Sequence, residues 1–115
     1  MTQQSFIHTP SEKWQALPQF PGTHFLPLAE PVPTGSIHRL RMDAGAIIPK
    51  HTHPCDEYVY VISGEIETGG RKCTAGTYWL APANIRQGPH KAITSTEIIT
   101  IRLGPMGEFE QLNHA

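Results

Sequence analysis

The sequence predicts an all-β fold, either a sandwich or a barrel, for this chain of 115 residues. Apolar segments recur at residues 58–62, 78–81 and 98–103, and each has the length of a single strand. No apolar stripe with helical spacing accompanies them, and no internal repeat is visible. Pairs of turn-forming residues mark the breaks between strands: Ser63-Gly64, Gly69-Gly70, Ala75-Gly76 and Gly88-Pro89. Composition alone does not choose between a sandwich and a barrel.

Residues 1–36 are expected to form an extended arm. Apolar side chains such as Trp14, Leu17 and Phe20 make this segment too apolar for a free linker. We therefore expect the arm to pack on the β-domain or on a partner subunit, and we expect the β-domain with a short C-terminal tail in residues 37–115. Six prolines rule out a long helix in the arm and would interrupt a central strand: Pro10, Pro18, Pro21, Pro27, Pro31 and Pro33.

The strand expected at residues 57–62 has apolar side chains on both faces. If Glu57 points inward, Val59 and Val61 share its face, because side chains alternate along a strand. The other face then carries Tyr58, Tyr60 and Ile62. A strand of this kind is covered on both sides, by the arm or by another subunit. We therefore expect a homodimer.

The last strand and the strand near residue 40 permit weaker predictions. Ile99 and Ile101 share one face of the last strand, and Thr100 and Arg102 share the other, which we expect to be the wet outer side. Two further arginines at residues 39 and 41 also share a strand face. They could clamp an anionic substrate, but an exposed strand face is the favoured interpretation.

Charge and hydropathy narrow the classes of partner. The formal net charge is −1, which gives no electrostatic case for binding nucleic acid or a membrane surface. No apolar run approaches the length of a transmembrane helix, and residues 1–4 do not resemble the start of a signal peptide. A cytoplasmic location is therefore expected, with Cys55 and Cys73 as reduced thiols.

Two histidines and a glutamate form the main candidate site. His51 and His53 are two residues apart, so in a strand both imidazoles project to one face, and Glu57 follows four residues later. Imidazole and carboxylate suit a divalent first-row metal, and two histidines with one carboxylate are typical of non-haem Fe(II) oxygenases. The alternative is two polar loop histidines beside an exposed glutamate.

The spacing around these residues resembles the first sequence motif of the cupin superfamily. It reads Gly45-x5-His51-x-His53-x3-Glu57-x6-Gly64 and agrees at each fixed position. The second cupin motif, Gly-x5-Pro-x-Gly-x2-His, is matched in its first half by Gly76-x5-Pro82. Asn84 and Gln87 then stand at the glycine and histidine positions, and Gly88-Pro89-His90 follows at once. The resemblance implies His90 as the remaining metal ligand, with the amide of Gln87 as its rival.

The resemblance also implies a double-stranded β-helix, or jelly-roll, cupin barrel with a divalent metal inside. Residues 57–65 and 76–82 are similar to the cupins of zinc-binding anti-sigma factors and of dioxygenases that cleave acetylacetone or dihydroxyacetophenone. Fe, Zn, Mn and Ni are all candidate metals. The implied function is a metal-dependent dioxygenase acting on a small, chelating, diketone-like substrate. The alternative is a non-catalytic module that binds or senses a metal or a small molecule, because cupins host both.

Other residues carry weaker expectations. Tyr78 and Trp79 could wall the pocket, but strand neighbours face opposite ways, so one of the two is expected to be ordinary core or surface. Arg86 is expected to stay away from the metal. Four histidines lack any matching spacing and are expected to be structural or solvent-facing: His8, His24, His38 and His114.

Overall fold

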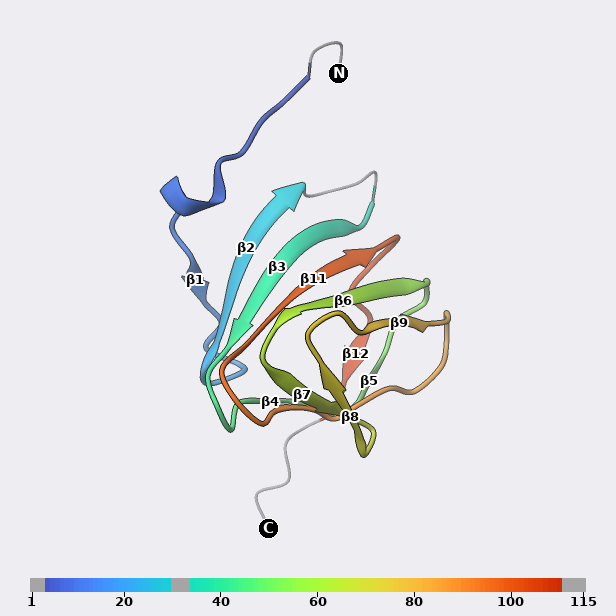
Figure 1. Cartoon of the computed structure of the whole chain (residues 1–115). Helices are drawn as coiled ribbons and strands as arrows, with labels where there is room; N and C mark the ends of the chain where they lie inside the picture. The colour runs from blue at the N-terminus through green and yellow to red at the C-terminus, as the bar shows by residue number, and fades with distance from the viewer. Residues whose placement is uncertain (1–3, 30–33, 111–115) are drawn as a thin grey trace.

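The computed structural model describes residues 4–29 and 34–110, which form an antiparallel jelly-roll barrel (Figure 1). Pro31, Pro33 and His114 lie outside these ranges. The described segments contain one short 3-10 helix, η1 (Thr9–Ser11), and no helix in them is long and apolar enough to cross a membrane. The strands are β1 (Gln15–Ala16), β2 (Thr23–Ala29), β3 (Ser36–Met42), β4 (Ile47–Ile48), β5 (His51–Thr52), β6 (Glu57–Ser63), β7 (Glu65–Thr68), β8 (Arg71–Thr74), β9 (Tyr78–Ala81), β10 (His90–Ala92), β11 (Thr96–Arg102) and β12 (Glu108–Phe109).

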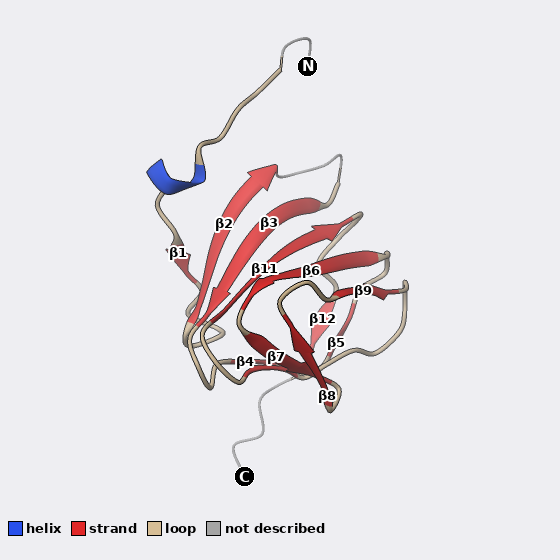
Figure 2. Ribbon diagram, in the orientation of Figure 1, coloured by secondary structure: helices blue, strands red, loops and turns tan. Residues whose placement is uncertain are grey.

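Three sheets build the barrel. The largest has the order β1-β2-β3-β11-β6-β9, and its neighbouring strands are all antiparallel. The second has the order β4-β10-β7-β8, and β12 pairs with β5. Figure 2 shows β2, β3, β11 and β6 side by side in a curved layer, with β4, β7 and β8 below them. Because β11 pairs with both β3 and β6, late and early parts of the chain share one wall of the barrel.

The inner face of the largest sheet follows the alternation expected of half-buried strands. In β6, Glu57, Val59 and Val61 are buried, whereas Tyr60 and Ile62 are exposed, so the predicted inward face of this strand is confirmed. Register then places Thr100 of β11 beside Val59 on one side and beside His38 of β3 on the other. The inward residues of three strands therefore form continuous rows across the sheet.

The predicted orientation of the last strand was wrong. Thr100 is only 3% exposed and faces the barrel interior with Ile98, while Ile99 and Ile101 face outward. The expectation followed hydrophobicity, which places isoleucines inside and threonine outside. It failed because the interior of this barrel is a partly polar cavity, which accommodates the hydroxyl of Thr100 and the side chain of Arg102.

The apolar core lies where the two larger sheets face each other. Met42, Val61 and Ile66 are fully buried there, and Cys73 packs against the same cluster. Gly64 makes the turn between β6 and β7 with φ +85°, and a Cβ at this position would lie 2.2 Å from the carbonyl oxygen of Ser95. The motif glycine at this position therefore serves a close approach of two backbones.

The outer face of the largest sheet carries large apolar side chains that the described residues leave exposed. Tyr60 of β6 pairs in register with Tyr78 of β9, and the next pair outward is Tyr58 with Leu80. Tyr60, Tyr78 and Leu80 are 46%, 57% and 46% exposed. In the single chain, the described residues of the arm leave this part of the face exposed.

Much of segment 1–36 belongs to the largest sheet. Strand β2 pairs with β3 along most of its length, and Phe20 and Leu26 are buried. Pro27 lies beside a bulge and beyond the two residues of β2 that pair with β1, so its missing N–H leaves no gap in that ladder. The boundary expected at residue 36 falls at the start of β3, within a single sheet, and the division into arm and barrel stays a prediction.

The arm also contacts the outer face of β3. The ring centroid of Trp14 lies 4.2 Å from the guanidinium carbon of Arg41, a cation–π distance. Arg39 pairs with Glu97 and donates a hydrogen bond to Thr9 Oγ1 at 2.9 Å. The two arginines therefore occupy an outer strand face and hold the arm.

Candidate metal centre

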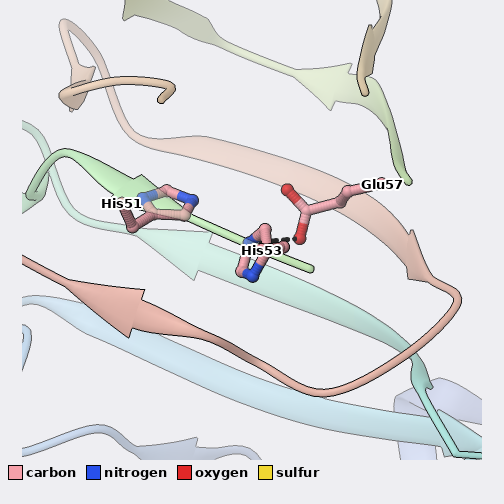
Figure 3. Close-up of side chains that lie close together, drawn as sticks. All are labelled: His51, His53 and Glu57. Atoms are coloured by element: carbon pink, nitrogen blue, oxygen red, sulfur yellow. Dashed lines mark ion pairs between the residues drawn. The ribbon is translucent and has the colours of Figure 1, made fainter. Parts of the chain in front are cut away.

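His51, His53 and Glu57 converge inside the barrel, where they line its cavity. His51 lies in β5, His53 just after it, and Glu57 begins β6, so a short turn brings the carboxylate back toward the two imidazoles (Figure 3). All three side chains are buried, and one ligand atom from each lies within 4.8 Å of the other two. This grouping agrees with the metal motif found in the sequence.

His51 is held with its Nε2 atom free. Its Nδ1 lies 2.8 Å from the carbonyl oxygen of Pro49. A carbonyl only accepts, so Nδ1 carries the proton and Nε2 carries a lone pair. The ring also stacks on Phe109 at 4.5 Å with an interplanar angle of 20°. Both contacts fix the ring plane, which a metal ligand requires.

His53 has the same arrangement. Its Nδ1 donates to the carbonyl oxygen of Met106, so its Nε2 faces inward, 3.1 Å from Oε2 of Glu57. In the neutral tautomer set by Met106, a nitrogen lone pair then faces a carboxylate oxygen. Within the described residues, no well-oriented hydrogen-bond donor reaches this buried nitrogen. Either a proton or a cation must lie between the two atoms.

The Glu57 carboxylate is suited to a cation. Burial acts to raise the pKa of Glu57, but the close approach of His53, together with the charges that His53, His51 and His90 can carry, outweighs burial and lowers the pKa below its ordinary value. The carboxylate is therefore ionised at neutral pH. Gln87 Nε2 donates to its other oxygen, Oε1, at 3.2 Å.

His90, in β10, lies beside this group. Its ring centroid is 5.1 Å from that of His51, and its Nδ1 lies 2.8 Å from the hydroxyl oxygen of Thr68, which can accept a hydrogen bond from it. Burial is the main cause that lowers the pKa of His90 to about 4, and it also lowers the pKa of His51. Both imidazoles are therefore neutral at neutral pH, which is the form that binds metals.

Gln87 reaches the same group from the loop before β10. Its backbone exchanges two hydrogen bonds with His51, at 3.0 and 2.9 Å. Its side-chain oxygen Oε1 is buried, and no donor in residues 4–29 and 34–110 reaches it. The amide nitrogen of Gln87 donates to Glu57, and its amide oxygen has no donor among the described residues. The geometry therefore does not decide whether His90 or Gln87 is the fourth ligand.

A divalent metal fits this donor set. His51 presents, and His53 can present, an unprotonated Nε2 atom in a group with the ionised carboxylate of Glu57. The neutral imidazole of His90 lies beside His51, next to this group of three. The partners on the remaining ring nitrogens, which the sequence could not identify, are the carbonyls of Pro49 and Met106 and the hydroxyl of Thr68. Such outer partners orient metal-binding histidines in proteins generally.

A cavity of about 280 Å³ adjoins the four side chains. Its walls are mostly apolar, including Phe20, Val59 and Trp79. Trp79 lines the cavity, whereas Tyr78 is exposed, which agrees with the expectation that one of the two is ordinary core or surface. The polar lining residues outside the candidate metal centre are Gln15, Gln19, His38, Thr100 and Arg102.

Several of the polar residues that line the cavity were not predicted from the sequence. His38 is buried and lines the cavity, with Nδ1 2.7 Å from Ser36 Oγ, although it had been grouped with the structural or solvent-facing histidines. The parity of β3 could have found it, because His38 shares a face with Leu40. Arg86 is exposed and pairs with Glu110, which agrees with the expectation that it stays away from the metal.

The chain belongs to the ChrR cupin-like domain family, whose sequence profile matches residues 2–107. A jelly-roll barrel with histidine and carboxylate side chains at its inner end is the arrangement expected of a cupin. The match extends across β1 and β2, so the family domain includes most of the segment expected to form the arm. No curated protein matches the chain significantly in sequence.

Solved structures with the same fold are distant in sequence. A candidate acetylacetone dioxygenase from Methylibium petroleiphilum PM1 is 18% identical, with a TM-score of 0.81 over 96% of this chain and 88% of that chain. The acetylacetone dioxygenase from Acinetobacter johnsonii is 16% identical, with a TM-score of 0.81 over 91% and 77%. The complex of Rhodobacter sphaeroides SigE with the anti-sigma ChrR gives 18% identity and a TM-score of 0.65 over 81% of this chain and 49% of that chain. At these identities the likeness establishes the fold.

Proposed function

We propose that this protein is a metal-dependent dioxygenase that acts on a small substrate with two chelating oxygens, of the diketone type. The observation that supports this function most directly is the convergence of lone-pair donors at the inner end of an apolar-walled cavity. The likeness of the fold to acetylacetone dioxygenases adds support.

We assign His51, His53, Glu57 and His90 as the metal ligands. Four protein ligands around a six-coordinate metal leave two positions open, which a chelating substrate or dioxygen can share. Fe²⁺ is the first candidate, with Zn²⁺, Mn²⁺ and Ni²⁺ as the others. A bound Fe²⁺ would supply Lewis acidity and electron transfer.

The protein's own residues would orient the substrate and exclude water. The carbonyls of Pro49 and Met106 hold two imidazoles in a fixed tautomer, so their Nε2 atoms need no rearrangement before binding. Phe20, Trp79 and Phe109 line the cavity with apolar surface that suits the carbon skeleton of a small diketone. Desolvation inside this cavity also strengthens electrostatic interactions with the chelating oxygens.

We also propose that the chain forms a homodimer through the outer face of its largest sheet. Exposed Tyr60, Tyr78 and Leu80 gather on two neighbouring strands there. A contiguous exposed apolar face of this kind marks interaction sites in soluble domains.

A non-catalytic binding module is the second candidate function. The family match supports it, because one structural neighbour is a complex that contains the anti-sigma ChrR. A closed four-ligand Zn²⁺ site would favour this candidate, since such sites are structural more often than catalytic.

Oxygen uptake tests the choice between these functions. Metal-free protein is loaded anaerobically with Fe²⁺ and then mixed with acetylacetone and air-saturated buffer in an oxygen electrode. If the protein is a dioxygenase, wild type should consume oxygen in proportion to the diketone lost. The exposed-site control His8→Ala should do the same, and His53→Ala should consume none. Binding of iron and acetylacetone without oxygen uptake would favour the binding module for this ligand.

A further inference from the structure

Arg102 pairs with Glu57 in the sheet and lines the same cavity as the candidate metal centre. It ends β11, and its inward orientation follows from the same parity that buries Ile98 and Thr100. Register pairs it with Glu57 of β6 on one side and with Ser36 of β3 on the other. Arg102 is a lining residue of the cavity and is partly buried.

The Arg102 guanidinium is held but not neutralised. Its Nε donates to the carbonyl oxygen of Gly104 at 3.0 Å, which fixes the plane of the group. Across the described part of the chain, neither terminal nitrogen of Arg102 forms an ion pair or a direct hydrogen bond, whereas Arg39 and Arg86 each pair with a carboxylate. Although Glu57 is its neighbour in register, the carboxylate oxygens of Glu57 are directed to Gln87 and His53.

Outside the candidate metal centre, the described residues that line the cavity carry no permanent charge other than that of Arg102. His38 lies one row deeper on β3, bonded to Ser36. Burial, followed by the nearby charge of Arg102, lowers the pKa of His38 to about 4, so this imidazole is neutral at neutral pH. Apart from the candidate metal centre, Arg102 is the one permanently charged residue among those lining the cavity in residues 4–29 and 34–110.

The positive charges of the metal and of Arg102 together favour an anionic ligand. A divalent metal held by one carboxylate and neutral imidazoles keeps an excess positive charge, and Arg102 adds another. A bound ion of this kind dominates the electrostatics of its site. A diketone that chelates the metal as its enolate would compensate one charge and leave the guanidinium unpaired, whereas a carboxylate would satisfy the fork of the guanidinium.

We propose that Arg102 binds the carboxylate of the substrate, and that the preferred ligand of this site is a small oxo acid whose carbonyl oxygen faces the candidate metal centre. This inference rests on the proposed metal-dependent function and, among small chelating substrates, favours anionic oxo acids in place of diketones. Arg102 acts as a specificity-determining residue.

A matched pair of ligands tests the proposal. Oxamate and oxamide have the same shape and the same pair of chelating oxygens, but only oxamate carries a carboxylate. Their affinities are measured by calorimetry on Zn²⁺-loaded full-length protein, in wild type, Arg102→Gln, Arg102→Lys and the exposed-site control Arg71→Gln. Wild type and Arg71→Gln should bind oxamate more tightly than oxamide, by at least about tenfold, as a charge-assisted contact predicts. Arg102→Gln should lose most of this preference, and Arg102→Lys should retain part of it.

Two results would overturn the proposal. One is a wild-type protein that binds the two ligands equally, a measurement that needs no variant to fold. The other is an Arg102→Gln variant with native metal content and an unchanged preference, which would assign the preference to the metal alone.

Metal analysis of each sample separates this outcome from failure of the proposed function. If wild type takes up no Zn²⁺ or Fe²⁺, the metal-dependent function is wrong. The role of Arg102 is then decided in the metal-free protein, where oxamate binding that Arg102→Gln abolishes supports it, and binding that the variant leaves intact contradicts it.

Discussion

The Nε2 atom of His53 lies 3.1 Å from Oε2 of Glu57, and the other nitrogen of the same ring donates to the carbonyl oxygen of Met106. The imidazole therefore turns a lone pair toward an ionised carboxylate, unless a proton is taken up between them. Two acceptors at this distance repel each other in a buried site. A cation coordinated by both atoms relieves that repulsion, so this pair defines one edge of the candidate metal centre.

The first prediction concerns Glu57→Gln. The amide nitrogen of the new side chain can donate to His53 Nε2, so the free energy of unfolding of the metal-free protein should change by no more than about 1 kcal/mol. Metal affinity should fall by more than about tenfold, because the variant removes the anionic ligand. Chemical denaturation and metal titration measure the two effects separately. A loss of stability with unchanged metal affinity would instead indicate a purely structural ion pair.

The second prediction concerns His51→Ala and His53→Ala. Each variant should bind far less metal than wild type, as measured by elemental analysis after equilibration with one metal equivalent. Chelation should lower the melting temperature of wild type but not of the two variants, because metal at 100 times its Kd contributes about 2.7 kcal/mol to stability. His8→Ala, at an exposed site, should behave like wild type in both measurements. Unchanged stoichiometry in either ligand variant would defeat the assignment.

The third prediction separates His90 from Gln87. If His90 is the fourth ligand, His90→Ala should lower metal affinity more than Gln87→Ala does. Thr68→Val should also weaken binding, by about tenfold or more, because it removes the partner of His90 Nδ1 while keeping the side-chain shape. The reverse order, with Gln87→Ala the more damaging change and Thr68→Val silent, would assign the ligand to Gln87.

The core of this site was predictable from sequence because its residues are close in the chain. His51, His53 and Glu57 fall within β5, the turn that follows it and the first residue of β6, so their spacing in the chain brings them together. The inward face of β6 followed from the same alternation. These are local rules that need no knowledge of the rest of the fold.

Contacts from distant parts of the chain were not predictable in this way. Met106 and Phe109 reach the histidines only because β12 pairs with β5, a pairing that no local pattern indicates. The inward position of Thr100 and Arg102 was missed because hydrophobicity assigns isoleucines to the interior. A barrel that encloses a partly polar cavity reverses that rule on one strand.

The fourth prediction concerns the outer face of the largest sheet. If that face forms a homodimer, Tyr60→Glu should give a monomer, because it places a charge at the centre of the exposed apolar patch and against its copy in the partner. Size-exclusion chromatography with light scattering measures the mass directly. The exposed-site control Arg71→Glu lies on the other large sheet and should leave the oligomeric state unchanged. A monomeric wild type at all working concentrations would remove the proposal.

The fifth prediction concerns the pH dependence of stability, measured with chelator present so that metal does not contribute. Burial, with a further effect of Arg102, lowers the pKa of His38 from 6.5 to about 4 in the folded chain. As the pH falls from about 6.5 to about 4, the unfolded chain takes up a proton that folded His38 refuses, so the free energy of unfolding decreases. The depressed pKa corresponds to a loss on the order of 3 kcal/mol for this group, complete near pH 4.

Because His90 has a pKa lowered to a similar value, His38→Gln should remove only part of this pH dependence of stability. Denaturant titrations between pH 4 and 7 should therefore show a shallower slope for His38→Gln than for wild type or the exposed-site control His8→Gln, and identical slopes would show that folded His38 accepts the proton freely.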